Sequence, residues 1–199
     1  MRNSEAPFPL VGEGRDGMRT FIAIELEDEI KEELLKAQQQ VQKQSKGGNF
    51  VPKENFHITL HFVGETEDSD LDYLKQAIYE TAMRNRCFDM TLERVGFFQR
   101  GEKGIFWVGM KESKELMRLF SHLEKNLLKE GFAREKKGLS PHITLGREVI
   151  PYRSFMDIVN HTKVEKKTIH VTKISLMESV RIGGKLVYKP LFQQFLKEQ

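Results

Sequence analysis

A four-residue phrase occurs twice in this chain, and the repeat constrains the fold more than any other feature of the sequence. His57-Ile58-Thr59-Leu60 is followed 85 positions later by His142-Ile143-Thr144-Leu145. Successive side chains of a β-strand point to opposite faces, so each copy places its histidine and threonine on one face and its two aliphatic residues on the other. Each copy therefore presents an imidazole beside a hydroxyl on a rigid backbone.

The surroundings of the phrase recur as well. Phe21-Ile22-Ala23 and Phe106-Trp107-Val108 are apolar runs typical of strands, and each begins 36 positions before its histidine. A charged helical stretch follows each run, and a second helical stretch and a further strand follow each phrase. We interpret this pattern as a duplicated strand-helix-strand-helix-strand unit. An approximate two-fold relation between the copies would point the two His/Thr faces at one another across a groove.

The remaining elements follow from periodicity and from turn residues. Strands are predicted over 18–26, 56–63, 88–98, 104–110, 168–179 and 186–195. Helices are predicted over 28–44, 70–85, 113–131 and 151–162. The Gly47-Gly48 pair within 45–49 predicts a break after the first helix, and the polar residues 99–103 predict a hairpin turn.

Strict alternation along 56–63 assigns its side chains to two faces. The core face is predicted to carry Phe56, Ile58, Leu60 and Phe62, and the opposite face His57, Thr59 and His61. His61 is then either an exposed residue near the mouth of the groove or half of a metal-ligand pair with His57. We expect no metal site, because no cysteine or carboxylate cluster lies near the pair in the sequence.

Two further features leave alternatives open. The basic run Arg134, Lys136 and Lys137 before the second phrase is either a solvated loop or a source of positive charge for phosphates. Arg147, three residues past Thr144, is the better phosphate-binding candidate, although strict alternation would turn it to the aliphatic face. Trp107 is either a core residue or the floor of a base-stacking surface.

Composition excludes several classes of protein. The chain has 199 residues, of which 39% are hydrophobic and 31% charged, and no apolar run approaches the length of a membrane span. A formal net charge of +3 is compatible with a polyanionic partner but too small to establish one. The single cysteine, Cys87, excludes an internal disulfide and fits a reducing cytoplasm. Residues 1–17 lack periodicity and are expected to form a flexible leader, native or added during cloning.

The chain resembles the 2H phosphoesterases, and within them the RNA 2′,3′-cyclic phosphodiesterases, historically called 2′-5′ RNA ligases. The resemblance is carried by both H-x-T-x phrases, by the opening strand 18–24, by Phe62-Val63-Gly64-Glu65 and by Ser140-Pro141-His142. It covers residues 18–199. It implies an α+β fold in one bilobed domain over 18–199, with two pseudo-symmetric antiparallel sheets lining a central groove and helices packed on the outside.

The resemblance also implies site residues and an activity. His57 is similar to the family's proton donor and His142 to its proton acceptor, while Thr59 and Thr144 hold phosphate oxygens. The implied reaction is hydrolysis of a 2′,3′-cyclic phosphate at an RNA end to a 2′-phosphomonoester. We expect a cytoplasmic monomer with no cofactor, no metal and no membrane partner. His61 departs from the family, whose members often carry lysine there.

The chemistry accounts for these residue types. Opening a cyclic phosphodiester needs one group to take a proton from water and another to give one to the departing ribose oxygen, on opposite sides of phosphorus. Imidazole titrates close enough to neutrality to serve in either role. Ligation to a 2′-5′ linkage, and opening of another cyclic nucleotide phosphate, are alternatives that use the same groups. A non-catalytic RNA-end binder is a third, weakened because lysine or arginine would hold phosphate more firmly than imidazole.

Overall fold

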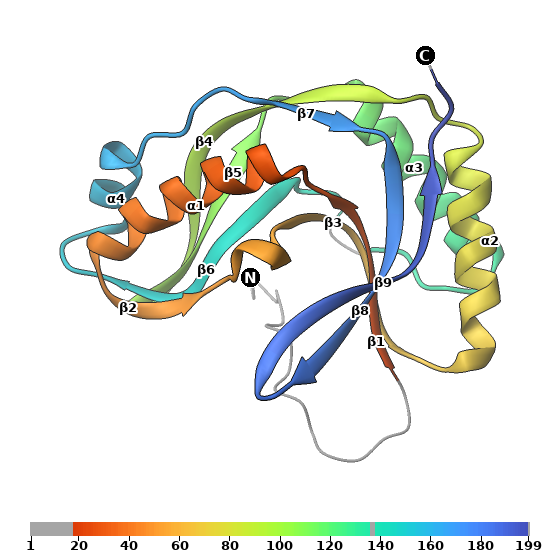
Figure 1. The fold of residues 1–199 in the computed structure, drawn as a ribbon, viewed down its shortest axis with the longest axis horizontal. Coiled ribbons are helices and arrows are strands. Elements are labelled where there is room, and N and C mark those ends of the chain that lie inside the picture. Colours follow the sequence, from red (N-terminus) through yellow and green to blue (C-terminus); the bar gives the residue numbers. More distant parts are fainter. Residues whose placement is uncertain (1–17, 136–137, 199) are drawn as a thin grey trace.

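The structure is a computed structural model that describes residues 18–135 and 138–198. The expected leader over 1–17, and Lys136 and Lys137 of the basic run, lie outside the described residues. The fold is α+β, as predicted, with two antiparallel sheets and helices packed against them (Figure 1). None of the helices in the described part of the chain is long and apolar enough to cross a membrane.

Sheet A has the strand order β3-β1-β8-β9 and sheet B the order β2-β6-β5-β4-β7. The strands of sheet A are β1 (Met18–Glu25), β3 (His57–Thr66), β8 (Lys173–Ile182) and β9 (Lys185–Phe195). Those of sheet B are β2 (Ser45–Phe50), β4 (Phe88–Arg100), β5 (Lys103–Met110), β6 (His142–Pro151) and β7 (Thr168–Val171). The two phrases therefore open β3 and β6, one in each sheet.

Four α-helices cover the sheets. They are α1 (Asp28–Lys43), α2 (Leu71–Ala82), α3 (Lys114–Lys129) and α4 (Phe155–His161), with short 3-10 turns η1 (Lys53–Asn55) and η2 (Asp68–Asp70). Helices α1 and α4 pack beside sheet B, and α2 and α3 pack together beside sheet A (Figure 1). In α3 the predicted cap is present, because the Ser113 hydroxyl accepts a hydrogen bond from the Leu116 N–H at 3.1 Å.

The two copies of the repeat exchange their third strands. Strands β1 and β3 of the first copy form sheet A, but its third strand, β4, pairs with β5 in sheet B. Strands β5 and β6 of the second copy form sheet B, but its third strand, β8, pairs with β1 in sheet A. One contiguous core runs through both halves, from Ile22 and Ile58 to Ile143 and Leu176.

The opening strands of the copies align with a shift of 84 residues, and the predicted shift of 85 is wrong for them. Ala23 pairs with Thr59 and Trp107 pairs with Thr144, so Ala23 and Trp107 are the equivalent positions. An apolar run buried on both faces has no period-two signal to define its register, which is why the sequence alone misplaced it by one residue.

Each phrase strand contains a β-bulge at the last residue of the phrase. The register against β1 skips Leu60 in β3, and the register against β5 skips Leu145 in β6, which is the matching position 85 residues later. A bulge adds one residue to a strand and reverses the alternation beyond it. Leu60 and His61 therefore both point to the interior, and Phe62 points outward.

This bulge corrects the predicted faces of β3. His61 is 5% exposed and turned to the interior, whereas Phe62 is 47% exposed and turned outward. The prediction assigned His61 to the His57 face and Phe62 to the core, because it assumed unbroken alternation. Strand β2 was also missed: residues 45–50, predicted as a break, pair with β6 despite containing Gly47 and Gly48.

Candidate active site

The two phrase histidines are held in the same way. His57 Nδ1 lies 2.7 Å from the backbone oxygen of Asn55, and His142 Nδ1 lies 2.7 Å from the backbone oxygen of Ser140. A carbonyl oxygen only accepts, so each Nδ1 carries a proton and donates it to that oxygen. Each ring is fixed by the residue two positions before it, and its Nε2 is then the nitrogen that can exchange a proton with a substrate.

The hydroxyl of the phrase lies beside the reactive nitrogen in the first copy. Thr59 Oγ1 is 2.9 Å from His57 Nε2, where the hydroxyl donates to the unprotonated nitrogen of the neutral ring. Asn55 is itself fixed, since it is 5% exposed and its Nδ2 donates to the Leu186 carbonyl at 2.9 Å. Strand β9 of sheet A thus supports the turn that orients His57.

The electrostatics of His57 show that the two halves of the chain meet at this ring. Burial lowers the pKa of His57 to about 4, and the hydrogen bond to the Asn55 carbonyl opposes that effect. The charges of Arg147 and His142, both from the second half, lower the pKa of His57 further. The first imidazole is therefore within electrostatic range of the second imidazole and of the guanidinium.

Arg147 lies on the site face because of the bulge at Leu145. Strict alternation would have placed it on the aliphatic face, but the extra residue turns it toward the side of His142 and Thr144. Its charge acts on Tyr188 as well as on His57, and burial raises the pKa of the Tyr188 hydroxyl. Thr59 thus lies beside His57 on β3, and Thr144 and Arg147 lie on the same side of β6 as His142.

Aromatic rings pack against each imidazole. The His57 ring lies 4.9 Å from the Phe21 ring and 5.1 Å from the Tyr188 ring, the latter edge to face. The His142 ring lies 5.4 Å from the Phe98 ring and 6.2 Å from the Trp107 ring. Tyr188 and Phe98 were missed by the sequence reading, because nothing in their local pattern relates them to the phrases; only the strand pairing brings them there.

The chain is similar in sequence and in fold to proteins of one family. The model of the family described as LigT like Phosphoesterase matches residues 24–107. The RNA 2′,3′-cyclic phosphodiesterase of Archaeoglobus fulgidus is 31% identical over 176 residues, covering 87% of this chain and 98% of that protein. The enzyme of the same name from Thermotoga maritima is 27% identical, covering 88% and 94%.

The chain belongs to the LigT-like phosphoesterase family. The predicted resemblance is thereby confirmed. Among solved structures, E. coli LigT complexed with 3′-AMP is 25% identical with a TM-score of 0.73, covering 91% of this chain and 99% of that one. A protein of Thermus thermophilus has the same fold with a TM-score of 0.79, covering 92% of this chain and 100% of that one.

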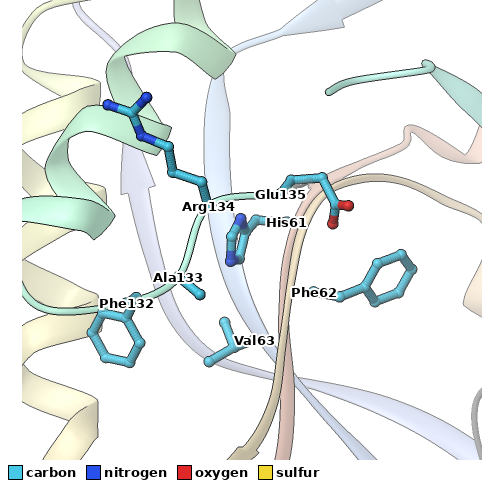
Figure 2. A pocket seen from close by; sticks show the side chains of 7 residues that line it. All are labelled: His61, Phe62, Val63, Phe132, Ala133, Arg134 and Glu135. Carbon is cyan, nitrogen blue, oxygen red and sulfur yellow. The ribbon is translucent and has the colours of Figure 1, made fainter. Parts of the chain in front are cut away.

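In this LigT-like chain, His61 forms a buried hydrogen-bonded pair instead of facing the site. Its Nδ1 lies 2.6 Å from Glu124 Oε1 of α3, and the second carboxylate oxygen of Glu124 accepts the Glu135 backbone N–H at 2.8 Å. A pocket of about 100 Å³ lies beside this pair, between β3 and the segment 132–135 (Figure 2). Residues 130–135 correspond in the repeat to β2, which pairs with β6. The pocket beside β3 therefore lies at the position that β2 occupies beside β6.

The other histidines of the LigT-like chain lie apart from the phrases. His161 at the end of α4 bonds its own helix through the Asp157 carbonyl at 2.7 Å, and His170 pairs with Asp89 at 2.7 Å in an exposed position. Asp89 raises the pKa of His170. Within residues 18–135 and 138–198, no group of three or more His, Cys, Asp or Glu side chains is arranged to hold a metal ion.

Proposed function

We propose that the chain hydrolyses 2′,3′-cyclic phosphates at RNA ends to 2′-phosphomonoesters, using its two phrase histidines as acid and base and no metal ion. The charge of His142 lowers the pKa of His57, and this electrostatic link between imidazoles of separate halves supports the proposal. In-line displacement at phosphorus needs proton transfer on opposite sides. Relatives named RNA 2′,3′-cyclic phosphodiesterase support the substrate class. The nucleotide held by E. coli LigT supports a nucleotide-sized ligand.

In this mechanism His142 accepts a proton from the attacking water and His57 donates one to the departing ribose oxygen. Each proton transfer is worth about 10²–10⁴ in rate. Thr59 and Thr144 donate hydrogen bonds to the non-bridging oxygens, and Arg147 neutralises the negative charge that these oxygens carry. To act as the proton donor, His57 must be protonated in the complex. Burial lowers the pKa of His57 to about 4 in the ligand-free chain, and the negative charge of a bound phosphate raises this pKa again.

A short RNA ending in a 2′,3′-cyclic phosphate tests the proposal. The purified chain should release a 2′-phosphomonoester at the same rate with and without EDTA. His57→Ala and His142→Ala should each reduce the rate by at least about 100-fold, since each removes one proton transfer. His161→Ala is the matched control, because His161 is exposed and bonded within its own helix. Full activity of either phrase variant would refute the mechanism.

The same experiment separates the remaining possibilities. A dependence on added metal after EDTA treatment would contradict the metal-free reaction. Tight binding of the RNA without turnover would indicate an RNA-end binding module. We also propose that the chain is a monomer and that it is located in the cytoplasm. The single cysteine favours the cytoplasm, where disulfides are rare.

A further inference from the structure

The bulge of β6 is held by donors from the first half of the chain. Leu145 is the extra residue, because the register of β6 against β5 skips it. Its backbone oxygen accepts the N–H of Val51, one residue past the end of β2, at 2.9 Å. The same oxygen accepts a hydrogen bond from Nε2 of Gln38 in α1 at 2.7 Å. The carbonyl at the bulge therefore depends on a side chain from another element.

Gln38 is buried and uses both N–H groups of its amide. It is 3% exposed, on a helix that packs against β2 and β6 (Figure 1). Its Nε2 lies 2.7 Å from the Leu145 oxygen and 2.7 Å from the Val51 oxygen. Carbonyl oxygens only accept, so the nitrogen of the amide, and not its oxygen, faces them. One side chain thus ties the end of β2 to the bulge, where a buried carbonyl without a donor would be costly.

The repeat places a polar side chain at the other bulge in the same way. The buried stripe of α1 recurs in α3 after 86 residues, so that Ile30, Leu34, Ala37 and Val41 correspond to Leu116, Phe120, Leu123 and Leu127. By this alignment Gln38 corresponds to Glu124, which bonds His61 directly after the bulge at Leu60. Each helix therefore supports the bulge in the phrase strand of the other copy, and this recurrence indicates that the side chain and the bulge act together.

Arg147 depends on the bulge of β6 for its direction. It lies two residues beyond Leu145, and the bulge turns it to the side of His142, from where its charge lowers the pKa of His57. We propose that Gln38 is a positioning residue for Arg147, because its amide fixes the bulge from which the guanidinium extends. The inference rests on the proposed function, since it takes the substrate phosphate as the group that Arg147 binds. Gln38 acts through the backbone of β6.

Gln38→Met tests this role, because methionine has nearly the same length and volume but no donor. With the RNA ending in a 2′,3′-cyclic phosphate, Arg147→Ala should raise KM at least about tenfold, as for loss of a hydrogen bond to a charged group. Gln38→Met should raise KM at least about threefold and change kcat less, since residues of one network are coupled to about this extent. In the Arg147→Ala chain the same substitution should leave KM unchanged. Gln40→Met is the matched control, because Gln40 Nε2 donates to the Lys36 and Lys163 carbonyls and not to β6.

The outcomes separate the positioning role from stability and from the function. An equal rise in KM with and without Arg147, no rise in either chain, or a fall in kcat alone would overturn the role. Gln38→Asn, whose amide ends one methylene short of the carbonyls, repeats the comparison if Gln38→Met does not fold. Failure of both variants to fold while Gln40→Met folds would assign Gln38 to stability and also overturn the role.

Absence of RNA hydrolysis by the unaltered chain would count against the proposed function instead. Calorimetric binding of inorganic phosphate then decides the role of Gln38. Arg147→Ala and Gln38→Met should each weaken this binding, and Gln38→Met should have no further effect in the Arg147→Ala chain. Equal binding by the unaltered chain and by Gln38→Met would overturn the positioning role.

Discussion

His57 donates from Nδ1 to the backbone oxygen of Asn55 at 2.7 Å, and His142 repeats that bond to Ser140 at the same distance. The two rings thus have the same tautomer and the same support. Their aromatic neighbours differ, since Phe21 and Tyr188 pack against His57 whereas Phe98 and Trp107 pack against His142. The assignment of donor and acceptor therefore has to come from reactivity, because hydrogen bonding alone treats the two rings alike.

A substrate with sulfur in place of the 3′-bridging oxygen should reveal the donor. A thiolate leaves without being protonated, so loss of the proton donor costs little with this substrate. His57→Ala should recover most of its activity on the sulfur substrate, and His142→Ala should stay inactive because water still needs a base. Recovery in His142→Ala alone would reverse the two roles, and recovery in neither would contradict acid catalysis of the leaving group.

Stability should fall as the pH drops from 6.5 toward 4. Burial lowers the pKa of folded His57 to about 4, below the unfolded value of 6.5, so the unfolded chain binds more protons in this interval. The contribution of His57 is fully retained above pH 6.5 and amounts to no more than about 3 kcal/mol. Urea unfolding at pH 4.5 and pH 7 should show a smaller difference for His57→Gln than for the unaltered chain. An identical difference in His57→Gln and in the control His161→Gln would contradict this.

The buried pair of His61 and Glu124 should matter more to stability than an exposed pair. Removing one partner of a buried pair leaves an uncompensated polar group and typically costs about 3–5 kcal/mol. Glu124→Leu also removes the acceptor of the Glu135 N–H. By comparison, Lys129 and Glu80 form a more exposed pair at 2.9 Å, and solvent screening leaves such pairs little effect on stability. Urea unfolding of Glu124→Leu and Lys129→Leu measures how much free energy of unfolding each variant loses. Equal losses would contradict a larger contribution from the buried pair.

Gly96→Ala should disturb Trp107 and thereby the site. The added Cβ would lie 2.2 Å from the indole, so the ring has to move, and overpacking of this kind costs about 1–3 kcal/mol. Tryptophan fluorescence should shift, and hydrolysis of the RNA ending in a 2′,3′-cyclic phosphate should slow, because the Trp107 ring lies 6.2 Å from the ring of His142. Gly47→Ala is the control, because a Cβ at Gly47 meets nothing within 4 Å. An unchanged spectrum in Gly96→Ala would show that the ring adapts freely.

The sequence predicted the fold class, the two strands that carry the phrases and the hairpin formed by β4 and β5, because these features depend on periodicity and on turn residues. It could not predict the bulges at Leu60 and Leu145, since a bulge leaves no mark in the apolar pattern. His61 was therefore placed on the wrong face, and the direction of Arg147 stayed open. The predicted alignment of Phe21 with Phe106 was wrong by one residue for a related reason, because neither apolar run alternates between apolar and polar residues.

The site was predicted only as far as its residues belong to the repeat. The structure keeps Thr59 beside His57 on β3, and Thr144 and Arg147 with His142 on β6, while their roles stay predictions. Tyr188 and Phe98 come from strands at other places in the chain, and only the pairing of β8 with β9 and of β4 with β5 carries them to the imidazoles. Long-range pairing of this kind is not encoded in local periodicity.

The interchange of β4 and β8 between the sheets has an evolutionary consequence. A polypeptide ending after β4 would hold β1 and β3 of sheet A but only β2 and β4 of sheet B, which do not pair with each other, so it could complete neither sheet by itself. Two identical copies could do so by lending each other β2 and β4, as in a domain-swapped dimer. The ancestor of this duplicated chain would then have been an obligate pair of half-length subunits, each contributing a single histidine to a common catalytic centre before gene fusion joined them.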